Sequence, residues 1–148
     1  MTTITNAQIC DAIRNKLVAA VGVAQSYNAL TEGMNDPNLI QVYPEAARQD
    51  PGGQTDRTTF GAHVRQTDTT INVDYYARQR REIGEDMAAL VAGIDAITAV
   101  LEAQSHEPAF GLAGIQQFSW SWTRVLFSYG DPDIRYIGAR FVIHIRTY

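Results

Sequence analysis

The sequence predicts an α+β fold, a two-layer sandwich with two helices packed on one face of a mainly antiparallel five-stranded sheet. Three observations predict it. The segments 5–21 and 81–104 place apolar residues every three or four positions, the period of an amphipathic helix. Other segments alternate apolar and polar residues, the period of a strand with one buried face. Short turns join most of these strands, which favours antiparallel pairing.

The first element is a helix over residues 5–21. Thr5 and Gln8 have the spacing of a capping box, in which each side chain bonds the other residue's backbone N–H. One apolar stripe follows the capping box, and we expect it to enter the core: Ile9, Ile13, Leu17 and Val21.

A short strand and two polar segments come next. Residues 25–38 are rich in Ser, Asn, Gly, Asp and Pro and are expected to form a loop. Residues 39–43 predict a strand, which Pro44 stops or marks as an edge. Residues 45–59 contain almost nothing that enters a core. Loops of that length in compact domains are usually functional or disordered, so we expect this one to contact a neighbour.

Two strands follow that loop. Residues 60–64 begin one strand, Thr67 and Asp68 predict a turn, and residues 70–78 form the next strand. Alternation in 70–78 separates an apolar face from a mixed face. The apolar face carries Ile71, Val73, Tyr75 and Ala77, and the mixed face carries Asn72, Asp74, Tyr76 and Arg78.

The second helix and the last two strands complete the fold. The helix over 81–104 has one apolar stripe made of Ile83, Met87, Leu90, Ile94, Ile97 and Leu101. A Pro/Gly loop over 105–114 leads to two long strands, 115–128 and 135–147. The sheet face away from the helices is expected to be largely polar.

Length and composition exclude several classes of protein. A chain of 148 residues predicts one domain, 1–148, with the long loop at 45–59. Cys10 has no partner for a disulfide within the chain and is expected to be buried and inert. No apolar run approaches the ~20 residues that a membrane span needs. The net charge of −4 disfavours a nucleic-acid-coating role.

The sequence lacks the usual patterns of a catalytic, nucleotide or metal site. It has no phosphate-binding loop and no nucleophile elbow. His63, His106 and His144 fall on different predicted elements, so a shared metal is not expected. We therefore expect no enzymatic activity and no cofactor. A small hydrolase remains an alternative, and it would need His63 or His144 beside a carboxylate in a cleft.

Several residue types favour a partner-binding surface instead. The chain has 11 Arg and one Lys, and Arg is favoured at interfaces, although a GC-rich genome gives the same bias. Arg78, Arg80 and Arg81 precede a helix, where positive charge opposes the helix dipole. They either contact an acidic partner or are balanced by neighbouring acids. Many large amphipathic side chains fall on predicted strands, among them Tyr43, Tyr75, Tyr76, Trp120, Trp122, Tyr129, Tyr136 and Tyr148.

The order of these segments is itself informative. It comprises an N-terminal helix, Gln-Val-Tyr-Pro-Glu at 41–45 before a polar loop, the strand 70–78, a helix around 86–90, the entry 111–115 and the last strand 139–145. This order resembles the tail-terminator (tail-completion) proteins of long-tailed bacteriophages and of tail-like particles. The likeness runs over nearly the whole chain and is one of pattern, without a diagnostic motif.

The resemblance implies a structural virion protein assembled in the host cytoplasm. It implies a ring, expected to be hexameric, that caps the head-proximal end of the tail tube, stops polymerisation and joins the neck or connector. The partners would be further copies of the chain, the tail tube protein and a neck or head-completion protein. Genomic DNA would pass through the lumen without specific binding. The subunit or neighbouring-ring interface is predicted at Arg48, Asp50, Gln54, Asp56, Arg57, Tyr76, Arg78, Arg80, Arg81, Arg140 and Arg146.

Three alternatives remain open at this point beside the small hydrolase. Two stay in the virion: a head-completion or neck adaptor, and a tail tube subunit. The third is a cytosolic α+β domain that binds a small molecule in a pocket under Trp120 and Trp122.

Overall fold

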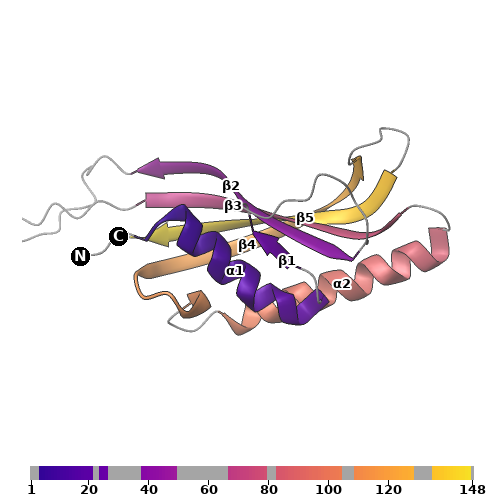
Figure 1. Cartoon of the computed structure of the whole chain (residues 1–148), viewed down its shortest axis with the longest axis horizontal. Helices are drawn as coiled ribbons and strands as arrows, with labels where there is room; N and C mark the ends of the chain where they lie inside the picture. The colour runs from indigo at the N-terminus through magenta and orange to yellow at the C-terminus, as the bar shows by residue number, and fades with distance from the viewer. Residues whose placement is uncertain are drawn as a thin grey trace, which may run out of the picture.

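A computed structural model describes residues 4–21, 24–26, 38–49, 67–79, 83–104, 109–128 and 135–147. They form a long twisted sheet with both helices on one side of it (Figure 1). In chain order the elements are α1 (Asn6–Val21), β1 (Ala24–Ser26), β2 (Leu39–Gln49), β3 (Thr67–Gln79), α2 (Ile83–Ala103), the 3₁₀ turn η2 (Ala109–Gly111), β4 (Ile115–Ser128) and β5 (Arg135–Thr147). The α+β class is confirmed, and none of the described helices is long and apolar enough to cross a membrane.

The strand order of the sheet is β1-β2-β3-β5-β4. Four strands, β2 to β5, pair antiparallel, rather than the five that the sequence predicts. The strand added to them is β1, three residues that pair with β2 in parallel. It falls partly in the predicted loop 25–38, because the polar composition of that segment gives no strand pattern. The predicted strand 60–64 lies outside the described residues.

Helix α1 begins as the sequence predicts. The Thr5 backbone N–H donates to Gln8 Oε1 at 2.9 Å, and the Gln8 N–H donates to Thr5 Oγ1 at 3.2 Å. This reciprocal pair satisfies two N–H groups that a helix start otherwise leaves without partners. The capping box is therefore confirmed.

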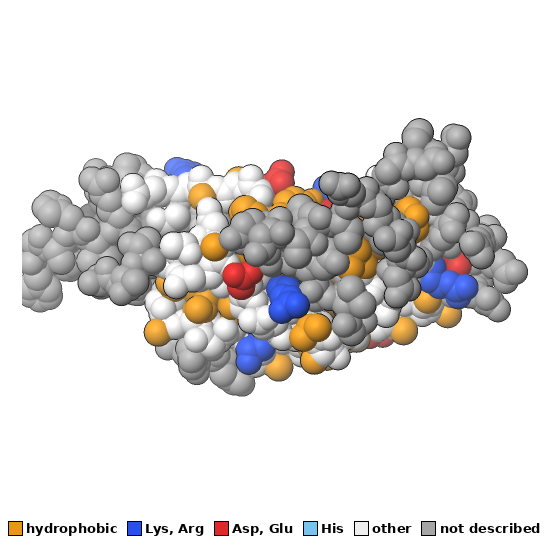
Figure 2. Space-filling view, viewed as in Figure 1, with side chains coloured by type: hydrophobic (Ala, Val, Ile, Leu, Met, Phe, Trp, Pro, Cys, Tyr) orange, Lys and Arg blue, Asp and Glu red, His pale blue; other side chains and the backbone are white. Residues whose placement is uncertain are grey.

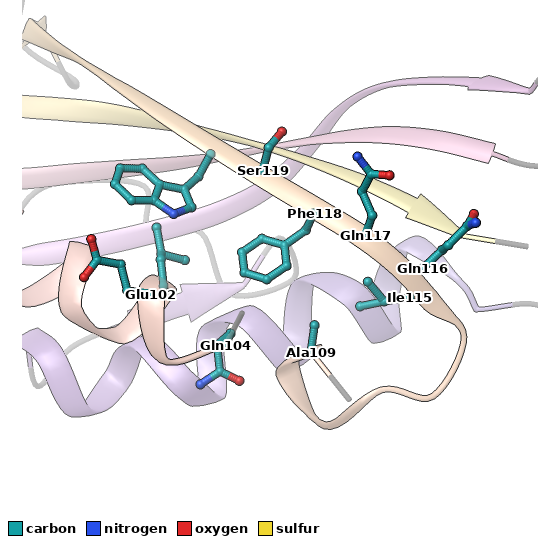
Figure 3. A pocket seen from close by; sticks show the side chains of 10 residues that line it. Glu102, Gln104, Ala109, Ile115, Gln116, Gln117, Phe118 and Ser119 are labelled. Carbon is teal, nitrogen blue, oxygen red and sulfur yellow. The ribbon is translucent and has the colours of Figure 1, made fainter. Parts of the chain in front are cut away.

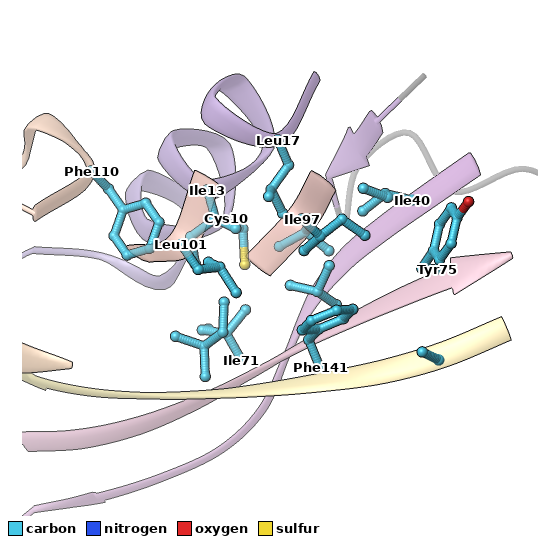
Figure 4. Packing of buried hydrophobic residues seen from close by; sticks show 14 of the residues in the cluster. Cys10, Ile13, Leu17, Ile40, Ile71, Tyr75, Ile97, Leu101, Phe110 and Phe141 are labelled. Carbon is cyan, nitrogen blue, oxygen red and sulfur yellow. The ribbon is translucent and has the colours of Figure 1, made fainter. Parts of the chain in front are cut away.

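The core lies between the two helices and the sheet (Figure 4). The stripes of both helices meet the inward side chains of β3 and β5, and the fully buried members include Ile13, Leu17, Ile97, Leu101, Ile71 and Phe141. Cys10 is buried among them, as expected. Helix α2 packs closely on the sheet at Gly93, where the Tyr75 ring occupies the space that any larger side chain would need.

Strand β2 is longer than predicted. It continues through Pro44 to Gln49, with a register shift between Pro44 and Ala46. Proline has no backbone N–H to donate. It is tolerated at position 44 because β1 pairs only with residues 40–42, so no described strand lies beside Pro44 on the outer side of β2. The expected loop at 45–59 is thus wrong for its first five residues, and residues 50–59 lie outside the described part.

Strand β3 begins earlier than predicted. Thr67 and Asp68 were expected to form a turn, but both belong to β3 and pair with Gln49 and Arg48 of β2. They pair on the other side with Thr147 and Arg146 of β5. Pairing on both sides outweighs the turn preference of a Thr-Asp dipeptide, because such preferences are weak against tertiary hydrogen bonding.

Candidate assembly surface

Five of the eleven predicted interface residues lie in the described part of the chain. They are Arg48, Tyr76, Arg78, Arg140 and Arg146. The other six lie outside it: Asp50, Gln54, Asp56, Arg57, Arg80 and Arg81. Their partners differ: Arg78 faces Asp86 of α2, whereas Arg140 and Arg146 pair with residues of β3.

Arg140 belongs to a hydrogen-bond network across three strands on the sheet face away from the helices. Its Nε donates to Asp74 Oδ1 at 2.7 Å and its Nη2 to Asp74 Oδ2 at 3.1 Å. The Tyr43 hydroxyl donates to the same Oδ2 at 2.7 Å. Asp74 is 3% exposed, and pairing with it raises the pKa of the Arg140 guanidinium above its usual range. Burial and the Asp74 carboxylate raise the pKa of the Tyr43 hydroxyl. Arg140 therefore holds strands β2, β3 and β5 together.

Three of the remaining four residues also contact other residues of the chain. Arg146 Nε donates to Asp68 Oδ1 at 2.8 Å and, with Arg48 nearby, holds the pKa of that carboxyl below its usual value. Arg78 Nε lies 3.6 Å from the buried carboxylate of Asp86 in α2. Tyr76 is 5% exposed and forms a small apolar cluster with Phe127 and Tyr136. These contacts account for Arg146, Arg78 and Tyr76 without a partner protein, whereas Arg48 is exposed and acts on Asp68 only through its charge.

The exposed apolar side chains gather elsewhere, along β4. This strand stands at the end of the sheet, and β5 is its only strand partner within the described residues. Its even-numbered side chains pair across from core residues of β5 and so point to the helix side. Phe118 and Trp120 pack against the core, whereas Trp122 and Leu126 are 44% and 42% exposed.

Helix α2 contributes a third exposed apolar side chain beside them. Arg124 Nη1 lies 3.9 Å from Met87 Sδ, which places Met87 of α2 against β4. Val91 lies one turn along from Met87, about 6 Å, and is 51% exposed. Helix α2 and strand β4 run antiparallel here, so the step from Met87 to Val91 runs toward the N-terminal end of β4. Trp122 precedes Arg124 by two residues and lies about 7 Å along β4 in that direction. We call Val91, Trp122, Arg124 and Leu126, with the outer backbone edge of β4, the β4 surface.

A groove adjoins the β4 surface at the start of the strand. It has a volume of about 570 Å³ and lies between the C-terminal end of α2 and residues 115–120 of β4 (Figure 3). Leu101, Phe118 and Trp120 form its apolar wall, and Glu102 is the charged residue of its lining. Trp122 does not line it, so the groove is not the pocket beneath both tryptophans considered above.

The described residues also bear on the other kinds of site considered above. They contain no group of three or more His, Cys, Asp or Glu side chains placed to hold a metal ion. His144 contacts Thr70 and, together with Asp68, lines a pocket of about 270 Å³, so one histidine does lie beside a carboxylate in a cleft, as the hydrolase alternative requires. Asp68 is engaged there by Arg146, and His63 lies outside the described part. Basic side chains on the face shown in Figure 2 stand apart from one another and form no continuous track there.

Sequence reasoning missed the β4 surface, although part of its signal was visible. The alternation in 115–128 placed Trp120 and Trp122 on one face, but alternation does not say how far the helices extend over a strand. Among the described residues, helix α2 packs mainly on β3 and β5, and Trp122 and Leu126 of β4 stay exposed. A comparison of the chain with protein-family models and with curated proteins finds no match.

Proposed function

We propose that this chain is a structural, self-assembling subunit without enzymatic activity. One observation carries the proposal: a 14-residue edge strand whose exposed side chains include Trp122 and Leu126. Soluble monomers usually shield such edges with charges, prolines or bulges, and large exposed apolar side chains beside an open edge are typical of association surfaces. Within the described part, β4 carries one charged residue, Arg124, and no proline, and its one register shift lies at its start, between Ile115 and Gln117, away from Trp122 and Leu126.

The two ends of the sheet differ, and this difference favours a ring. At one end stands the long β4, and at the other stands the short β1 beside β2. A ring is built from heterologous contacts, in which one patch meets a different patch on the next copy. An interface that uses β4 and a second, unlike surface meets that requirement.

The more specific proposal follows the resemblance of the sequence. We propose a ring, hexameric in the resembling proteins, that caps the head-proximal end of a phage tail tube and joins it to the neck or connector. The net charge of −4 supports a lumen through which DNA passes, because a negative subunit gains no affinity from phosphates. A neck adaptor or a tail tube subunit uses the same surface and differs in its neighbours.

Native mass spectrometry at micromolar concentration tests the proposal. We expect a closed six-fold mass that does not grow with concentration. The double substitution Trp122→Ser and Leu126→Ser should leave a folded monomer. Thr123→Ala, on the opposite face of β4, is the matched control and should keep the ring. An open-ended polymer would instead indicate a tube subunit, and a monomer at every concentration up to the solubility limit would refute self-assembly.

A further inference from the structure

The groove beside β4 has the geometry of a site for an added strand. On one side it is bordered by residues 115–120 of an edge strand, and on the other by the end of α2. In β-strand addition, the open backbone edge supplies hydrogen bonds and a neighbouring pocket takes every second side chain of the added segment. Figure 3 shows Phe118 directed toward α2, with Gln117 and Ser119 on the other side of the strand.

The lining of the groove specifies the occupant. Leu101, Phe118 and Trp120 suit apolar side chains at alternate positions of an extended segment. Glu102 is exposed and is the one charge among the residues that line the groove. A carboxylate at the rim favours a segment that carries positive charge and no acid.

One segment of this chain fits that description. Residues 57–66, Arg-Thr-Thr-Phe-Gly-Ala-His-Val-Arg-Gln, place Phe60, Ala62 and Val64 at alternate positions. The sequence predicts a strand at 60–64, which lies outside the described residues. Arg57 precedes this predicted strand and Arg65 follows it. Whether the segment adds parallel or antiparallel to β4, one of these two arginines therefore lies at the end nearer to Glu102.

The short connection between Val64 and Thr67 determines which copy provides the segment. Thr67 pairs with Thr147, and Thr147 with Ile115, so β3, β5 and β4 lie side by side at this end of the sheet. A strand outside β4 is three strand spacings from β3, about 14 Å. Val64 is three residues from Thr67, and three extended residues reach at most about 11 Å. The predicted strand therefore cannot lie in the groove of its own copy.

We propose that residues 60–64 of one copy add as a strand to the outer edge of β4 in the next copy, with Phe60 and Val64 in the groove. This inference rests on the proposed self-assembly and adds to it a contact in the groove that adjoins the β4 surface. The donated segment and the groove are different surfaces, so the contact is heterologous and repeats from copy to copy, as a ring requires.

Complementary variants of the full chain test the proposal. Phe60→Ser weakens the donated segment and leaves the groove intact, and Glu102→Arg reverses the charge of the groove and leaves the segment intact. Each variant alone should lose the ring. Their mixture should yield a heterodimer and no ring, because only one of the two possible contacts is functional. Asp95→Arg is the matched control: it makes the same charge change at an exposed position of α2 outside the groove and should keep the ring.

A labelled peptide of residues 57–66 gives a second readout. It should bind the Phe60→Ser chain saturably in fluorescence anisotropy, and Glu102→Arg in that chain should weaken binding by about tenfold or more. Backbone N-methylation at alternate peptide residues distinguishes strand addition from simple side-chain insertion. One of the two methylation patterns should abolish binding and the other should not, because only alternate N–H groups face β4.

Failure of this inference is distinguishable from failure of the proposed function. A wild-type ring that survives both Phe60→Ser and Glu102→Arg, with no peptide binding, would overturn strand donation and leave the ring in place. A wild-type chain that is monomeric, while the peptide binds the Phe60→Ser chain with the stated Glu102 dependence, would support the groove and overturn the ring.

Discussion

Replacing Arg140 with methionine should destabilise the fold by about 3 kcal/mol. Asp74 would lose two of its three side-chain hydrogen bonds, those from the guanidinium at 2.7 and 3.1 Å, and would keep only the bond from Tyr43. Removing one partner of a buried ion pair typically costs about 3–5 kcal/mol, because the other charge stays buried. The Arg140 side chain is 40% exposed, so water replaces part of its role and we expect the lower end.

Urea denaturation at fixed chain concentration measures this effect. With a slope of about 2 kcal/mol per molar urea, the midpoint should fall by about 1.5 M. Tyr43→Phe removes one hydrogen bond to the same carboxylate and should cost about 1.5 kcal/mol.

A double substitution separates a charge network from simple packing. Asp74→Asn combined with Arg140→Met removes both charges, so the pair should cost clearly less than the sum of the single substitutions. A loss below about 1 kcal/mol for Arg140→Met, the range of exposed ion pairs, would refute the structural role given to Arg140. Additive single effects would refute the coupling.

Three further predictions concern the remainder of the described fold. The pKa of Asp68 is lowered beside Arg146, so this exposed pair adds stability above the unfolded-state pKa of Asp and loses it as the pH falls through the lower, folded-state pKa. Asp68→Asn should therefore cost about 0.5 kcal/mol at pH 7 and nothing at pH 2, as urea midpoints at the two pH values would show. Gly93→Ala should lower the melting temperature by an amount equivalent to about 1–3 kcal/mol, because the new methyl group meets the Tyr75 ring, and an unchanged melting curve would contradict this packing. Burial raises the pKa of Cys10 to about 11, so labelling with a thiol reagent at pH 8 should be slow in the native chain and fast in urea; rapid native labelling would show that α1 opens.

The helices and the long strands could be predicted because their signals are local. The capping box at Thr5 and the α2 stripe that includes Leu90 and Ile97 depend on residues within a few positions of one another. The predicted bounds of the last two strands, 115–128 and 135–147, match those of β4 and β5. Hydrophobic periodicity is the strongest such signal, and here it gave the correct element types.

The extension of β2 and the roles of the arginines depend on distant partners. Residues 45–49 have the composition of a loop, but they pair with the start of β3. Arg140 was predicted at an interface because it falls on a polar face. Its actual partner, Asp74, is 66 positions away, a separation that periodicity cannot bridge. The candidate surface was missed for the same reason, since the reach of α2 over β4 is a tertiary property.

The position of β5 between β3 and β4 has a consequence for biosynthesis. β5 is the last of the five strands to leave the ribosome, yet it alone connects β4 to the remainder of the sheet. Until β5 emerges, the edge of β3 that pairs with β5 has no partner among the described strands, and neither has β4. Such long-range pairing is slow and exposes aggregation-prone edges in the meantime. The nascent chain would therefore be most vulnerable after β4 has emerged and before β5 has, and chaperone demand should be highest for chains that stop short of Arg135.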